Sequence, residues 1–382
     1  MTIQPMDNDQ LMIKARERYN FIVDKGSYLP GVSDTIDPYT PPEWFDRDRF
    51  NKSQKIADKY FLSLSYSSSV GLLLGIQIPI FTEPLLTTGT HKNIPKLYRR
   101  YLSTVIHVNN WYKDDPFLKG SAAYKSIHQV RSMHKKIFEL MNKNTGKVVG
   151  QDRVWVSQCE MAMTQWAFFA LLILYPKDCA GHGLTQDDLE HIIYLWRVIG
   201  YLMGIEDRFN LGQGTFQECK SLYKVILDDF MRPKLSENPH PYQTGYDVSH
   251  AIAKALRPVN SEIRFNVILN YWYKILDIPY EVPLKPVHKL RLMFLKFALS
   301  TTLKSSFFYR FACERQKKKL KAQMKKKEKV EEQLTKKYPD IVFESKCPFA
   351  CDLGYSDVFD RKQDESQDEV KMEDQNANII NA

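Results

Sequence analysis

The sequence lacks the paired cysteines of a structural zinc site or a disulfide framework. Its six cysteines are scattered over 382 residues, and only Cys347 and Cys351, in CPFAC, lie close together. That spacing is not CxxC and no second pair accompanies it, so we interpret the cysteines as free thiols in a reducing compartment. With 43% hydrophobic and 13% aromatic residues, the chain can still bury a large core.

A secretory signal is missing from the first residues, MTIQPMDNDQLMIKARERYN, in which no basic segment precedes an apolar one. We therefore expect an intracellular protein made on free ribosomes. Two apolar stretches invite a membrane interpretation, but Phe61 to Thr82 contains five serines, and 161–175 is only about fifteen residues long. We expect both to be core helices of a large helical protein.

Alternation of apolar and polar residues, the pattern of a half-buried strand, is scarce. Helical periodicity and turn segments such as KNTGK instead predict an all-α protein. We expect a Pro-rich lead-in over 1–47, one large multi-helix domain over 48–314, and a charged tail over 315–382. The expected helices are 48–62, 66–78, 94–113, 121–142, 155–175, 185–203, 214–231, 246–257, 260–275 and 286–313.

The net charge of +9 is unevenly distributed along the chain. Residues 315–337 carry a net charge of +8 and residues 338–382 a net charge of −7, which predicts a basic helix followed by an acidic, disordered tail. No aromatic residue interleaves the basic run, so nucleic acid is not a favoured partner. Just upstream, 289–311 combines cations with large apolar residues. Residues 289–337 are therefore a candidate for peripheral contact with an anionic membrane, the alternative being a core-packing helix with a polar back.

One histidine interrupts an apolar stripe within VRSMHKKIFE (130–139). His134 occupies the position that completes the stripe, where a buried imidazole is able to hold an iron porphyrin as an axial ligand. A hydrogen-bonded core histidine is the ordinary explanation, and His107 and His191 have an equal claim from spacing alone. The apolar members of the stripe are Tyr124, Ile127, Val130, Phe138 and Met141.

Five segments occur in a characteristic order: TEPLLTTG, RRYLST, VRSMHKK, VSQCEMAMTQWAFFALL and GIEDRFN. Their order and spacing resemble the oxygenase family that includes bacterial latex-clearing protein (rubber oxygenase) and the fungal farnesyl-chain-cleaving oxygenase MpaB. The resemblance covers residues 60–215 well and extends more weakly to about residue 310. It implies a globin-like helical core around haem b, whose iron would serve an oxygenase that cleaves carbon–carbon double bonds of isoprenoid chains with molecular oxygen.

The same resemblance assigns the site residues. The proximal iron ligand falls on His134, and the arginine one turn earlier falls on Arg131, which would approach a haem propionate or orient the helix, unless it is a surface salt-bridge residue. The distal polar cluster falls on Arg100 and Thr104, which share a helix face because they are four residues apart. The family's glutamate falls near Glu83.

These residues would have distinct tasks. If desolvated, Glu83 would have a raised pKa and act as a base toward an allylic proton, while Arg100 would hold it in place. The alternative for TEPLL is a helix start, with Thr82 as the cap and Pro84 in the first turn. Latex-clearing proteins have a lysine directly before the threonine; this chain has Ser103, which removes a positive charge from the distal side.

Three functions remain open at this point. The leading hypothesis is a haem b-dependent oxygenase that cleaves or oxidises double bonds of a hydrophobic small molecule, such as a prenyl chain or other lipid, in the cytoplasm or on the surface of the endoplasmic reticulum membrane. The second is a non-catalytic haem-binding or sensor protein. The third is a haem-free helical scaffold or lipid-binding protein.

Overall fold

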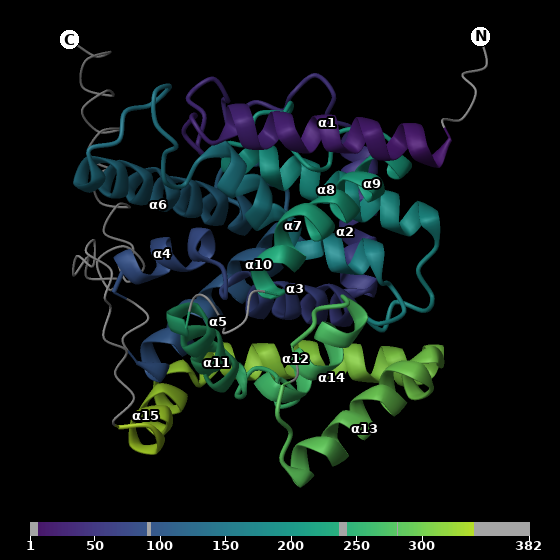
Figure 1. Cartoon of the computed structure of the whole chain (residues 1–382). Coiled ribbons are helices and arrows are strands. Elements are labelled where there is room, and N and C mark those ends of the chain that lie inside the picture. The colour runs from purple at the N-terminus through teal and green to yellow at the C-terminus, as the bar shows by residue number, and fades with distance from the viewer. Residues whose placement is uncertain (1–6, 90–92, 237–242, 281, 340–382) are drawn as a thin grey trace, which may run out of the picture.

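The computed structural model describes residues 7–89, 93–236, 243–280 and 282–339. Within these ranges the chain contains no strand, apart from one isolated bridge between Pro30 and Ser157, which confirms the predicted all-α class. Figure 1 shows α1, α6 and α8 at the top, α3 and α4 across the middle, and α12 to α15 at the bottom. The helices are α1 (Asn8–Gly26), α2 (Arg47–Lys59), α3 (Phe61–Gly75), α4 (Pro79–Thr87), α5 (Ile94–Trp111), α6 (Ala122–Thr145), α7 (Gln158–Leu174), α8 (Gln186–Met203), α9 (Phe216–Ile226), the π-helix η1 (Leu227–Met231), α10 (Arg232–Ser236), α11 (Gln243–Leu256), α12 (Phe265–Ile275), α13 (Pro286–Ser300), the 3₁₀ turn η2 (Thr302–Lys304), α14 (Ser306–Lys325) and α15 (Lys327–Lys337).

Helix α7 lies at the centre of the protein because it is apolar on every side. It packs against α1, α3, α8 and α9. Trp166 and Phe169 are fully buried in it, and the indole N–H of Trp166 donates to the backbone oxygen of Tyr223 at 3.0 Å, so the one polar atom of that ring is paired. The prediction that 161–175 is a core helix is confirmed.

Small residues let α3 approach α7 closely. Ser63, Ser67 and Gly71 follow one another at intervals of four, and all three are buried. A Cβ placed on Gly71 would lie 1.9 Å from the backbone oxygen of Ala167, so no larger residue fits there without movement. The hydroxyl of Ser68 also donates across the contact, to the backbone oxygen of Phe168 at 2.8 Å. Like 161–175, this apolar stretch lies in the core, as expected.

No single helix in the described part of the chain is long and apolar enough to cross a membrane. Helices α3 and α4 reach that length and composition only as a pair, and they meet at an angle of 89°. The sharp turn follows from Pro79, which begins α4 and cannot continue the preceding helix.

Two helices were not expected from the sequence. Helix α1 lies within the Pro-rich lead-in, where Asp7 caps it by accepting the backbone N–H of Gln10, and it buries only a narrow stripe against α9 and α7. Helix α4 was absent from the expected helices, and the alternative interpretation of TEPLL, a helix start capped by Thr82, is wrong in its cap: the helix starts at Pro79, and the Thr82 hydroxyl donates back to the carbonyls of Ile76 and Ile78.

The basic run is helical and part of the packed structure. Helix α14 continues across residue 314 to Lys325, and α15 follows it and packs against α5. Three apolar residues of the run, Leu320, Val330 and Leu334, are buried, while Met324 is exposed. The acidic segment from residue 340 onward, with Cys347 and Cys351, lies outside the described residues.

Candidate functional site

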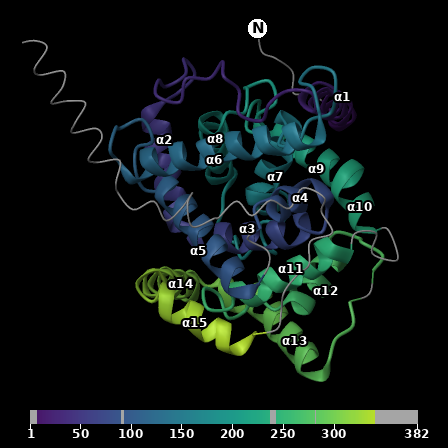
Figure 2. The ribbon, with the colours of Figure 1, turned by 90° about the vertical axis from the view of Figure 1, so that its left-hand side faces the viewer.

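An apolar cavity of about 310 Å³ lies among α3, α4, α5, α6 and α7, at the lower end of the volumes of small-molecule sites. Figure 2 shows α6 above α3, α4 and α5. Leucine, isoleucine, valine, methionine and phenylalanine side chains form most of the wall. Representative wall residues are Leu64, Leu72, Phe81, Leu85, Val108, Val130, Met133, Ile137, Met161 and Phe168.

Most hydroxyl groups in the wall are turned back to the helix that carries them. Those of Ser69, Thr104 and Thr164 donate to the backbone oxygens four residues earlier, at 2.7, 3.2 and 2.8 Å. Because their hydrogens are engaged in the helix, these side chains offer the cavity their methyl or methylene surface. The polar character of the site therefore comes from a few ionisable and amide side chains.

His134, on α6, lines the cavity as the helical stripe predicted. Burial lowers the pKa of its imidazole to about 4, and the nearby positive charge of Arg100 acts in the same direction. The ring is therefore neutral at pH 7. Its Nδ1 atom is buried and has no hydrogen-bond partner among the described residues. A neutral imidazole with an unengaged nitrogen is the form that coordinates iron.

Arg100 and Thr104 line the same cavity from α5, together with Val108 and Trp111. The face of this helix that was predicted from the spacing therefore forms a wall of the cavity. The effect of the Arg100 charge on the pKa of His134 places the two side chains near one another. Thus the structure brings together three of the site residues expected from the sequence.

Glu160, which was not expected, also lines the cavity. It lies in the first turn of α7. Its backbone N–H donates to the hydroxyl of the cap residue Ser157, and its side-chain carboxyl accepts a hydrogen bond from the backbone N–H of Val156. Burial raises the pKa of this carboxyl to about 8, against the opposing effect of those backbone hydrogen bonds. At neutral pH, Glu160 therefore carries a proton at the cavity wall. The Ser-x-x-Glu pattern before a wholly apolar helix was the available signal.

His107 and His191, the other two candidates for an axial ligand from spacing alone, have different positions. His107 lines the cavity from α5, and burial lowers its pKa to about 4; its Nδ1 lies 2.7 Å from the hydroxyl of Ser126. His191 lies outside the cavity wall, with its Nδ1 3.0 Å from the hydroxyl of Ser53. His191 is thus a hydrogen-bonded core histidine.

Glu83 and Arg131 are not among the described residues that line the cavity. Glu83 lies on α4, whose residues Phe81, Pro84 and Leu85 do form the wall. The guanidinium of Arg131 donates to the backbone oxygens of Ser33, Ile36 and Leu202, at 2.8 to 3.1 Å. Of its expected roles, this position matches the one that orients α6.

The described residues contain no group of three or more His, Cys, Asp or Glu side chains that could hold a bare metal ion. An axial ligand to haem iron requires only one imidazole. Fold and cavity together define a class: an all-α protein that encloses an apolar ligand site beside a neutral imidazole, a guanidinium and a protonated carboxyl.

Comparison with known proteins gives the family. The model of the ER-bound oxygenase mpaB/B'/rubber oxygenase catalytic domain matches residues 62–299, and the chain belongs to this family. The solved structure of latex clearing protein LCP in the closed state matches with a TM-score of 0.51 and 13% identity, over 78% of this chain and 89% of that one; it supports the fold. No curated protein matches the sequence.

Proposed function

We propose that this protein is a haem b-dependent oxygenase that uses molecular oxygen to cleave or oxidise carbon–carbon double bonds of an isoprenoid or similar lipid. The observation that carries the proposal is His134, a neutral imidazole that lines an apolar cavity and whose Nδ1 has no hydrogen-bond partner among the described residues, in a member of the rubber oxygenase family.

The residues around the cavity fit such a cofactor. His134 would supply the axial nitrogen, and the apolar walls from α3, α6 and α7 would enclose a large flat hydrophobic ring. Haem, when bound, would supply the iron that activates molecular oxygen. The low pKa of His134 matters here, because a protonated imidazole has no lone pair to donate.

The remaining groups would act on the substrate. An apolar wall whose hydroxyls are engaged in their own helices excludes water and accepts a hydrocarbon chain without a hydrogen-bonding cost. Arg100, which lines the same cavity, would stabilise negative charge that develops on oxygen or on the substrate. A carboxyl group would accept the allylic proton of the substrate. Glu83 is the candidate by resemblance and Glu160 by position in the wall.

The absorption spectrum of protein purified with haem supplied during expression tests the proposal. We expect a Soret band that shifts on reduction, is lost or strongly displaced in His134→Ala, and is unchanged in His191→Ala. The second variant is a matched control, because His191 is buried but bonded to Ser53 outside the cavity. Oxygen consumption with short prenyl lipids would then test turnover.

Each contrary result favours a different function. A colourless wild-type protein that folds normally would contradict the proposal in favour of a haem-free lipid-binding protein. A normal spectrum without oxygen consumption on any prenyl lipid would favour a haem sensor. If turnover is found, Glu83→Gln and Glu160→Gln will show which carboxyl takes part: the one that acts should lower kcat by about a hundredfold or more.

A further inference from the structure

A large apolar surface is exposed at one end of the protein. Eight side chains on α13 and the first turns of α14 have 50–66% of their surface accessible, and we call this set the α13–α14 face. Elsewhere on the described surface, exposed apolar residues are scattered. The members of the α13–α14 face are Val287, Leu290, Met293, Phe294, Phe297, Phe307, Phe308 and Phe311.

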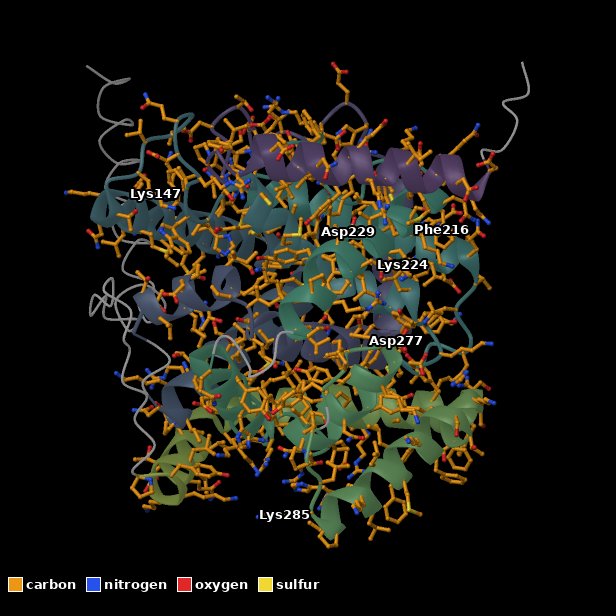
Figure 3. All side chains as sticks on the ribbon, viewed as in Figure 1. Lys147, Phe216, Lys224, Asp229, Asp277 and Lys285 are labelled. Carbon is orange, nitrogen blue, oxygen red and sulfur yellow. The ribbon has the colours of Figure 1, made fainter. Side chains whose placement is uncertain are left out.

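The arrangement of α13 is unlike that of a core helix. Val287, Leu290, Phe294 and Phe297 recur at intervals of three and four and form one stripe, yet this stripe faces outward. Leu299 is the one buried residue of α13. Figures 1 and 2 both show α13 projecting below the body of the protein, and Figure 3 places Lys285 at the tip where this helix begins.

The charges around this face have one sign. Between residues 285 and 310 the sequence contains six Lys or Arg residues and no Asp or Glu. Five of them are exposed: Lys285, Lys289, Lys296, Lys304 and Arg310. Aromatic and aliphatic residues mixed with cations bind the boundary between the headgroups and acyl chains of an anionic bilayer. A soluble partner would need a surface both apolar and acidic.

The face is also connected to the cavity through α14. This helix carries Phe307, Phe308 and Phe311 on the face, while Gln316 and Leu320 line the cavity further along it. At 1.5 Å per residue, Phe311 and Leu320 are separated by about 14 Å along the helix axis. The part of the cavity wall that α14 forms is thus close to the exposed apolar surface.

We infer that the α13–α14 face docks on the surface of an anionic lipid membrane, and that apolar substrates enter the cavity from that side. The aromatic side chains lie at the boundary between the headgroups and the acyl chains, and the surrounding lysines and arginines bind the lipid charges. The statement about substrate entry rests on the proposed function, whereas the docking itself needs neither haem nor turnover.

Co-sedimentation of the full chain with phosphatidylcholine vesicles, with and without phosphatidylserine, tests the docking. Binding is expected to require phosphatidylserine and to weaken as salt is raised. Phe294→Ser with Phe297→Ser should lower the affinity roughly tenfold or more, since each phenylalanine loses contact with the acyl region. Lys289→Glu with Lys296→Glu should abolish the dependence on phosphatidylserine.

Ile13→Ser with Leu118→Ser is the matched control, because these residues are 61% and 62% exposed on other faces. This variant should bind like the wild type, and circular dichroism should show that all variants fold. Three outcomes would overturn the inference: no binding of the wild type to anionic vesicles, equal loss in the control pair, or a stable dimer in solution that the Phe294 and Phe297 changes disrupt. Binding that appears only when residues 340–382 are removed would also overturn it, since the chain's own tail would then be the occupant.

Discussion

At the scale of single residues, the buried environment of Glu160 disfavours its ionised form. It stands at the start of an apolar helix, and the Val156 N–H that it accepts belongs to a residue with a positive φ of 53°. The hydrogen bond therefore supports a turn that a non-glycine residue rarely adopts. A neutral carboxyl makes this bond without the cost of a buried charge, which is why the proton stays on.

The raised pKa of Glu160 predicts that stability falls as pH rises. The folded protein keeps the proton up to about pH 8, whereas the unfolded chain releases it near 4.5. The unfolded state binds fewer protons in this interval, so the free energy of unfolding should decline by about 1.4 kcal/mol per pH unit. Histidines whose pKa is lowered in the folded protein, among them His107, His134 and His250, oppose this decline up to about pH 7.5, because the unfolded chain still binds part of their protons there. Urea unfolding between pH 6.5 and 8 should show the decline as the difference between the wild type and Glu160→Gln, in which the contribution of the histidines cancels.

Glu160→Gln should remove that decline, because the amide oxygen can accept the Val156 N–H without titrating. Glu139→Gln, at an exposed position of α6, controls for the loss of one negative charge. A Glu160→Gln protein with the same pH slope as the wild type would show that the carboxyl is ionised when folded.

Helical spacing predicted the direction of three side chains, whose roles at the site stay predictions. His134, Arg100 and Thr104 each share a face with apolar neighbours, and all three line the cavity. Glu160 was missed because a first-turn acid is normally solvated, and only the packing around α7 shows otherwise. The position of Arg131 depends on backbone oxygens more than sixty residues away in the chain, at Ser33 and Leu202, which no local pattern reveals.

At the scale of elements, the contact between α3 and α7 depends on the absence of side-chain atoms. Local propensity does not favour α3, whose fifteen residues include five serines and two glycines. Tertiary packing overrides that propensity, because small residues allow the backbones to approach. The sequence predicted both helices but not this reason for the serines. Helix α1 was not predicted from the sequence, because few of its residues are buried and its mean hydropathy is low.

Gly71→Ala and Gly75→Ala form a matched pair within α3. A Cβ at position 71 would lie 1.9 Å from the backbone oxygen of Ala167, so α3 must move away from α7, at a cost of about 3 kcal/mol or more. A Cβ at position 75 meets only the Phe81 ring at 3.5 Å, an ordinary contact. Gly75→Ala should therefore stabilise by roughly 0.5–1 kcal/mol through helix propensity. Thermal unfolding compares the two. Equal effects would mean that α3 and α7 are less closely packed than described.

At the scale of the whole molecule, α15 packs against α5, the helix that contributes Arg100 and Thr104 to the cavity wall. While Arg100 and Thr104 face the cavity, the neighbouring Arg99 pairs with Glu331 of α15, with Nη2 and Oε2 2.8 Å apart. Val330 and Leu334 are buried beside this pair. The basic run was predicted as a solvated helix, and charge alone could not indicate that its few apolar residues are anchored on α5.

Val330→Ala with Leu334→Ala should release α15 and destabilise the protein by about 2–4 kcal/mol. Hydrogen exchange measured by mass spectrometry should increase in α5 and leave α1, which lies at the far side of the protein, unchanged (Figure 1). Met324→Ala, at a residue that is 42% exposed on α14, is the control and should alter neither quantity. If hydrogen exchange in α5 is unchanged, α15 does not stabilise the helix that carries Arg100 and Thr104.

The contact between Arg99 and Glu331 has a consequence for biosynthesis. The two residues are 232 positions apart, and Leu320 of the cavity wall is synthesised almost as late as Glu331. During translation, α3 to α7 emerge and collapse while one wall of their cavity is still missing. If the proposed cofactor is bound, it could enter sideways through this opening, and docking of α14 and α15 would then retain it. Loading of that cofactor would be completed only when α14 and α15 have left the ribosome.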